Sequence, residues 1–212
     1  DINHNIRGTY LSWAGNFADI FLEYADKIST KKISNFGGIP NDTLKRGYGY
    51  YQNINIYFGN WGLSTEYKHY SFDRLNGDIT ANEYGNQIEY QQMPTLAKEH
   101  NSTLLGRVSH TYSFNDERGI QFELNGSIMD LAISMQYAHL SRNEKWRSNS
   151  ENDWSHSIID NYLPSSDFSA LPYWENYNEI SGYTLNERLY FKIGHGINRE
   201  IIKNLRNFIG YQ

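Results

Sequence analysis

The chain has 212 residues, a formal net charge of -5 and a mean hydropathy of -0.71, and 18 of its residues are tyrosine. No run approaches the roughly 18 consecutive apolar residues of a membrane-spanning helix, so a membrane protein with this sequence must cross with strands. The dispersed charge, without a basic stripe, argues against nucleic-acid binding. The absence of cysteine excludes disulfides, thiolate catalysis and cysteine-ligated metals.

A first hairpin is predicted over residues 8–27, because Gly15-Asn16 suits a two-residue turn with glycine in first place. Pairing Ala14 with Phe17 places the apolar side chains of both strands on one face, since side chains alternate between faces along a strand. Phe21 is an apolar exception on the opposite, polar face.

A second hairpin is predicted around Gly59-Asn60. Pairing Phe58 with Trp61 brings the aliphatic residues of both strands to one face and their amide and charged residues to the other. A one-residue slip would mix the two faces, so this agreement supports the register. On the polar face, the ring of Tyr57 is expected to cover the strand glycine Gly62.

Stretches rich in glycine, proline, asparagine and serine predict long connections over residues 28–46, 72–102 and 140–171, with a short strand inside the second at residues 87–91. Between the last two, the segment Thr103–His139 contains three runs that alternate apolar and polar residues. The runs cover residues 103–114, 120–125 and 131–137, and they predict an antiparallel meander.

Weaker alternation predicts two further strands, at residues 173–181 and 188–197. The last stretch, residues 198–212, fits either a turn followed by a strand or a short helix. Short turns mostly alternate with long loops along the chain, and this order fails only between Asn125 and Asp130.

One-sided alternation fits a soluble sheet on a core, and equally a barrel that shows its apolar face to lipid and its polar face to a lumen. Runs of about ten residues, aromatic residues near strand ends, and the alternation of short turns with long loops favour the barrel. The predicted fold class is therefore all-β. We expect an antiparallel meander of about 8 to 10 strands, forming an up-and-down transmembrane barrel or part of one, as a single domain over residues 1–212.

Three sets of residues follow from this hypothesis. The residues predicted to face lipid are Ile54, Ile56, Leu63, Ile120, Phe122, Leu124 and Ile133. The polar residues predicted to face the lumen are Glu23, Asn53, Asn55, Glu66, Lys68, Arg107, Glu123 and Gln136. The aromatic residues predicted to lie at the membrane interface, near the short turns, are Trp13, Phe58, Trp61, Tyr112 and Phe114.

No glycine-rich phosphate loop, nucleophile elbow or metal-ligand pair of histidines occurs, so we predict no catalytic residue, cofactor or metal site. Carboxylates at Glu23, Glu66 and Glu123 would suit glycoside hydrolysis only if two lay about 5 to 9 Å apart. A barrel enzyme with carboxylates at its rim is thus a third hypothesis. Ion pairs with Lys68 or Arg107 are the simpler expectation for these groups.

Several segments are similar to parts of a known family. These are Pro94–Ser127, with Lys-Glu-His before its strand and Asn-Asp-Glu-Arg-Gly-Ile-Gln-Phe-Glu-Leu-Asn after it, Leu-Glu-Tyr-Ala-Asp-Lys ending at Lys27, and Tyr-Gly-Tyr-Tyr at Tyr48–Tyr51. They resemble uncharacterised outer-membrane β-barrel proteins of Bacteroidota and related bacteria, over most of the chain. The resemblance implies a fold and an outer-membrane location, and it carries no catalytic residues.

One departure from that family is the end of the chain, Gly210-Tyr211-Gln212, because such barrels usually close on a strand with an aromatic last residue. With no Met or signal peptide before Asp1, we expect a processed form or a segment of a longer protein. Asp42-Thr43-Leu44 resembles the O-glycosylation signal of exported Bacteroidota proteins, which makes Thr43 a candidate modification site.

The function expected from these features is non-enzymatic: passage of small solutes through a polar lumen, or docking of partner proteins on long loops. The expected partners are outer-membrane lipid and further outer-membrane or periplasmic subunits. The competing hypothesis is a secreted, soluble β-sandwich that binds carbohydrate through loop aromatics such as Trp154, which lies close to Asp153 and His156.

Overall fold

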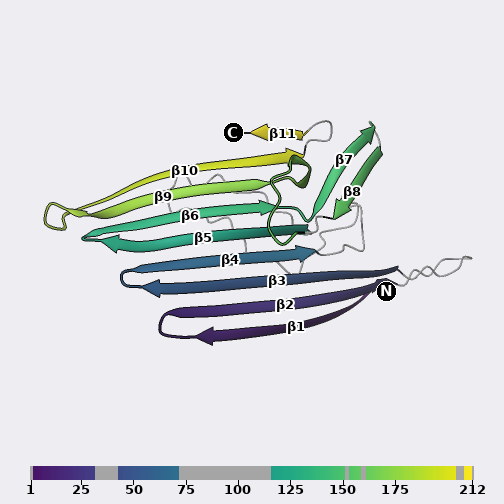
Figure 1. Cartoon of the computed structure of the whole chain (residues 1–212), viewed down its shortest axis with the longest axis horizontal. Coiled ribbons are helices and arrows are strands. Elements are labelled where there is room, and N and C mark those ends of the chain that lie inside the picture. The colour runs from purple at the N-terminus through teal and green to yellow at the C-terminus, as the bar shows by residue number, and fades with distance from the viewer. Residues whose placement is uncertain are drawn as a thin grey trace, which may run out of the picture.

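A computed structural model of the chain describes residues 2–31, 43–71, 116–150, 153–158, 161–203 and 208–211. Nine strands form one antiparallel sheet in the order β1-β2-β3-β4-β5-β6-β9-β10-β11 (Figure 1). Their bounds are β1 Ile2–Ala14, β2 Ala18–Lys31, β3 Thr43–Phe58, β4 Trp61–Ser71, β5 Asp116–Ile128, β6 Leu131–Ser141, β9 Tyr173–Thr184, β10 Leu189–Lys203 and β11 Phe208–Tyr211.

The excursion between β6 and β9 contains the hairpin of β7 (Glu144–Ser150) and β8 (Asp153–Ile158) and the 3-10 helix η2 (Phe168–Ala170). The hairpin projects from the end of the sheet opposite the short turns (Figure 1). We call that end the far end. The predicted all-β meander is confirmed, but within the described residues β1 does not pair with β10 or β11, so the sheet is open.

The hairpin of β3 and β4 has the predicted register, with Phe58 opposite Trp61 and each earlier pair in step. Its turn is two residues long, and Gly59 has a φ of 59°, a conformation that glycine adopts without steric cost. The predicted cover of Gly62 is also present, because Cδ1 of Tyr57 lies 3.8 Å from the position that a Cβ on Gly62 would take.

The hairpin of β1 and β2 forms, but its predicted turn is wrong. Ala14 pairs with Asp19, so four residues rather than two lie between the paired positions. Gly15 is not among the described residues with positive φ, as the two-residue turn would require, and its N–H donates to the carbonyl of Ala18 at 2.9 Å. The pairing shifts by two positions, which changes each residue's partner and leaves every side chain on its predicted face.

Among the other predictions, two need correction and two lie outside the described residues. The predicted connection over residues 28–46 is too long, because β2 extends to Lys31 and β3 begins at Thr43. The stretch 140–171 is not wholly irregular, because it contains β7, β8 and η2. The predicted strands at 87–91 and 103–114 fall outside the described residues. β4 pairs directly with β5 along its whole length. In the last stretch, residues 198–203 continue β10 and residues 208–211 form β11, so these described residues are in strands and not in a helix.

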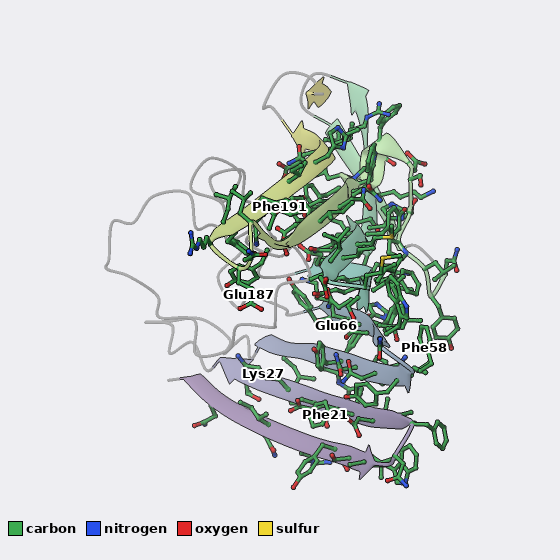
Figure 2. The ribbon with its side chains drawn as sticks, turned by 90° about the vertical axis from the view of Figure 1, so that its left-hand side faces the viewer. Phe21, Lys27, Phe58, Glu66, Glu187 and Phe191 are labelled. Carbon is green, nitrogen blue, oxygen red and sulfur yellow. The ribbon has the colours of Figure 1, made fainter. Side chains whose placement is uncertain are left out.

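The two faces of the sheet differ in composition. The polar face carries Glu23, Asn53, Glu66, Gln121, Glu123, Gln136, Glu175 and Glu179. The apolar face carries Leu11, Ile20, Ile54, Leu63, Leu124, Ile133, Ile180 and Ile193. Figure 2, viewed from the short hairpins, shows the sheet bending, with Glu66 and Phe58 on opposite sides.

From β3 to β9 the polar face is the more buried of the two. Gln136 is 3% exposed and the small buried core of Ala138, Leu140 and Tyr173 lies on this face, whereas Ile193 on the apolar face is 69% exposed. Side chains on the inside of a bent sheet converge, and those on the outside spread apart. The distribution is the reverse of a soluble sheet packed on an apolar core.

The strands are also staggered. Following the pairs across the sheet, Ala14 on β1 lies level with Gly196 on β10, yet β10 begins at Leu189, closer to the short hairpins. The hairpins therefore step along the strand direction from β1 to β10 (Figure 1). Each hairpin is shifted in the same direction relative to the one before it. Such a shift is required when the strands of a curved or closed sheet are inclined to its axis.

A glycine on the apolar face fixes one ring at the short-hairpin end. Gly126 pairs with Trp61, and a Cβ added to Gly126 would lie 2.9 Å from Cγ of the indole and closer still to Cδ2 and Cε3. Gly126→Ala should therefore displace Trp61 and lower stability by about 1 to 3 kcal/mol. Urea unfolding would measure the loss and tryptophan emission the displacement. Gly8→Ala, whose added Cβ meets only the carbonyl oxygen of Tyr24 at 3.7 Å, is the matched control. Equal stability of both variants would contradict the expectation.

Candidate functional site

The polar face is the candidate site, because it gathers the titratable and amide side chains of seven neighbouring strands. All the described members of the predicted lumen set lie on it: Glu23, Asn53, Asn55, Glu66, Lys68, Glu123 and Gln136. Arg107 lies outside the described residues. The placement follows from strand alternation together with the pairing register.

A buried ion pair lies toward the far end of this face. Nζ of Lys68 on β4 lies 2.6 Å from Oε1 of Glu117 on β5, and the two side chains are 1% and 4% exposed. The ring of Tyr70 lies beneath the same ammonium, 5.6 Å from Nζ. We expected Lys68 to pair with Glu23, Glu66 or Glu123; its close partner is Glu117, which the predicted strand starting at Ile120 left out.

Hydrogen bonds join the amides and carboxylates nearer the middle of the face. Nδ2 of Asn53 donates to Oε1 of Glu66 at 3.4 Å and to Oγ of Ser64 at 3.5 Å. Nδ2 of Asn55 donates to Oδ1 of Asn53 at 2.8 Å. These bonds run within and across strands, so the polar groups hold one another in place along the face.

β9 and β10 extend the face with Lys192 and with two residues that the sequence did not single out, Tyr177 and Glu179. Oη of Tyr177 donates to Oε2 of Glu179 at 2.8 Å, and Oε1 of Glu179 accepts from Lys192 at 2.7 Å. The ring of Tyr177 lies over Gly194 and Gly196, where added Cβ atoms would come within 2.6 Å and 3.2 Å of it. The signal that was missed is an aromatic residue opposite two strand glycines.

Acidic groups outnumber basic groups on the polar face in the described part of the chain. Among the residues whose side chains the structure describes, the acidic members are Asp19, Glu23, Glu66, Glu117, Glu123, Glu175, Glu179 and Glu200, and the basic members are Lys27, Lys68 and Lys192. A concave surface with this excess holds a negative potential, which favours cations and disfavours anions.

The apolar face holds every member of the predicted lipid-facing set: Ile54, Ile56, Leu63, Ile120, Phe122, Leu124 and Ile133. Trp13, Phe58 and Trp61 lie on the same face beside the short hairpins, and Trp13 and Phe58 are about half exposed. Tyr112 and Phe114 are outside the described residues. The face is not uniformly apolar, because Asn176, Asn178 and His195 lie on it in β9 and β10.

The far end is fastened by the segment after β6. Asn143 is the centre of three bonds: its Oδ1 accepts from Nε of Arg118 at 2.5 Å, its Nδ2 donates to the carbonyl of Tyr70 at 2.7 Å, and its N–H donates to Asp116 at 3.0 Å. Further along, Oη of Tyr67 donates to the carbonyl of Tyr162 at 2.7 Å. The N–H of Ser165 donates to Oγ of Ser141 at 2.9 Å, and the N–H of Ile201 donates to the carbonyl of Pro172 at 3.1 Å, so residues 161–172 are tied to the sheet at three points.

Asp167 links this segment to β7. Its Oδ2 lies 3.0 Å from Nζ of Lys145, and its Oδ1 accepts from N and Oγ of Ser169 at 3.0 Å and 2.8 Å. The bonds from Ser169, then the bond from Lys145, lower the pKa of Asp167 to about 2. Because the folded pKa lies below the ordinary value of 3.8, the stabilisation is present above about pH 4 and is lost as the pH falls toward 2.

Hydrogen exchange of residues 161–172 should therefore speed up between about pH 4 and pH 2, beyond the intrinsic pH dependence of exchange. Mass spectrometry of that peptide against a β3–β4 peptide would measure the change. Asp167→Asn should remove the excess. An unchanged pH dependence in that variant would show that other groups control the segment.

Thr43 begins β3, and its side chain is not described. Asp153, Trp154 and His156 belong to β8. In the described residues, no group of three or more histidine, aspartate or glutamate side chains is placed to hold a metal ion. Within those same ranges, no helix has the length and apolar character needed to cross a bilayer. Comparisons of the chain with protein-family models, curated proteins and solved structures give no match.

Proposed function

We propose that the chain is an outer-membrane β-barrel protein, or part of one, whose polar face lines a water-filled lumen through which small solutes pass. The observation that carries the proposal is the inverted distribution of polarity, with the polar face inside the bend and the apolar face outside. In water this arrangement would leave much of the apolar surface exposed. In a bilayer, the same surface would meet hydrocarbon.

The length of the apolar band supports the proposal. On β5 the apolar face runs from Ile120 to Ile128, interrupted by Gly126, over about 27 Å at about 3.4 Å per residue. Strands inclined by about 40° would give a band about 20 Å high, close to the roughly 25 Å of outer-membrane barrels. Trp13, Phe58 and Trp61 lie at one border of the band, and Tyr24 and Tyr50 lie toward the other. Such girdles are typical of barrel interfaces.

The charge of the polar face supports a preference among solutes. The acidic excess would admit neutral and cationic solutes more readily than anions, most strongly at low ionic strength. The buried ion pair of Glu117 with Lys68 and the partly exposed pair of Glu179 with Lys192 give these carboxylates structural roles.

The first test is heat modifiability. The protein is extracted from bacterial outer membranes and its migration in mild SDS is compared before and after boiling. A band that shifts on boiling, together with swelling of liposomes that contain the protein in a neutral sugar, would support the proposal. A monodisperse protein that is soluble without detergent would overturn it.

The competing sandwich lacks a partner sheet in the described residues, where the second sheet consists only of β7 and β8. The polar groups Asn176, Asn178 and His195 on the apolar face are the observation that favours it. Solubility without detergent would promote this alternative, with a carbohydrate ligand at exposed aromatic residues.

A further inference from the structure

Three aromatic rings form a row on the polar face across β1, β2 and β3. The rings of Tyr10 and Phe21 are stacked with their centroids 6.3 Å apart, and Phe21 lies 6.2 Å from Tyr51. Tyr10 is 74% exposed and Phe21 is partly exposed. Because the surrounding face is polar and the apolar residues lie on the other side, these rings are not part of an apolar core.

Polar side chains lie directly between and beside the rings. Glu23 is paired with Tyr10 on one neighbouring strand and with Tyr51 on the other, so Glu23 lies between the two tyrosines on the same face. Phe21 is paired with Ser12 and with Asn53. Each ring in the row therefore has a hydroxyl, amide or carboxylate group on the neighbouring strand.

A shallow pocket continues this surface toward the short hairpins. It has a volume of about 240 Å³ and is lined by Asn55, Tyr57, Gly62, Leu63, Ser64 and Asn125. Tyr57 is half exposed, and its Oη donates to Oδ2 of Asp19 at 2.6 Å. Nδ2 of Asn125 donates to Oε1 of Glu123 at 2.7 Å. The amide oxygen of Asn125 can then accept a hydrogen bond from a ligand hydroxyl.

The arrangement matches the chemistry of a sugar ring, which has an apolar C–H face and an edge of hydroxyl groups. Aromatic rings give the C–H face a flat surface to pack on, and amide and carboxylate oxygens accept hydrogen bonds from hydroxyls. The acidic excess of this face disfavours sulfated or uronic sugars. A row of rings with repeated polar neighbours suits several sugar units in succession.

We propose that Tyr10, Phe21 and Tyr51, together with the Tyr57 pocket, form a binding track for neutral oligosaccharides on the wall of the lumen. The inference rests on the proposed function, since it takes the polar face as the path of the solute. It names neutral oligosaccharide as the class of solute that this path retains.

The test is calorimetric titration of the full chain, folded in mild detergent, with maltopentaose, cellopentaose and xylopentaose. At least one sugar should bind at millimolar concentration or below. In the double variant Tyr10→Ala/Phe21→Ala the affinity should fall at least about tenfold, which corresponds to about 1.4 kcal/mol. The control is Tyr137→Ala, which removes an exposed tyrosine ring from the apolar face and should leave the affinity unchanged.

Tyr10→Ala alone, on the edge strand, serves if the double variant does not fold, and it should also weaken binding. Binding of none of the three sugars, or equal binding by wild type and variants, would overturn the track. Heat modifiability of the same preparation separates the two proposals. A heat-modifiable protein without sugar binding overturns only the track, whereas sugar binding by a detergent-free, soluble protein overturns the barrel and keeps the aromatic row as a binding surface.

Discussion

Leu124→Arg is expected to prevent assembly of the protein in a membrane. Leu124 lies in the middle of the apolar face, paired with Leu63 on one side and Met135 on the other. If this face meets lipid, an arginine near the middle of the bilayer costs about 2 to 4 kcal/mol. Folding into phospholipid vesicles, followed by the boiled and unboiled migration of the protein, would measure the loss.

Asn125→Arg is the matched control, because the neighbouring residue lies on the polar face and is exposed. It adds the same charge to the same strand and should assemble almost normally. Normal assembly of Leu124→Arg would contradict the assignment of this face to lipid. Failure of both variants would instead indicate that β5 tolerates no added charge, whatever its direction.

Lys68→Met is expected to give the largest loss of stability among single substitutions on the polar face. The variant leaves Glu117 buried without its close cation, and removing one partner from a buried ion pair typically costs about 3 to 5 kcal/mol. Equilibrium unfolding in urea, with the protein in detergent or vesicles, would measure the change. The double variant Lys68→Met/Glu117→Gln removes both charges and should recover most of that loss, because neither side chain then carries an unpaired charge.

A double variant no more stable than Lys68→Met would show that the cost lies in packing around the methylene groups and the Tyr70 ring, and not in the charge. A single variant that unfolds like the wild type would show that water reaches Glu117 and that the pair is not buried in solution. Lys192→Met is the comparison on β10, where the pair with Glu179 is partly exposed and the expected loss is below about 1 kcal/mol.

Alternation along each strand made the two faces predictable. Around Gly59 both the two faces and the pairing register were predicted correctly, because with a two-residue turn a single pairing keeps the apolar residues on one face and the polar residues on the other. At Gly15 the same argument chose the wrong turn, since the backbone there closes a longer loop. The faces were still correct, because the error was two positions and the period of a strand is two.

Pairing between distant strands was less predictable. Glu117 lies on the same face of β5 as Gln121 and Glu123. It was missed because β5 begins at Asp116, four residues before the alternation of apolar and polar residues that predicted the strand. The β7–β8 hairpin was missed because its residues are mostly polar and charged and lack an apolar period. Neither the burial of Lys68 nor the stacking of Tyr10 on Phe21 follows from one strand alone, since each depends on which strand lies beside it.

The directions of the outer strands restrict how the open sheet can be completed. Strands β1 to β6, β9 and β10 alternate in direction, so β1 and β10 run antiparallel to each other. Because β11 pairs antiparallel with β10, β11 runs parallel to β1, and a cylinder made only of antiparallel neighbours needs an odd number of further strands between β11 and β1. An even number, or none, would force one parallel pair. Completion of this sheet is thus a question of parity, whichever polypeptide supplies the strands.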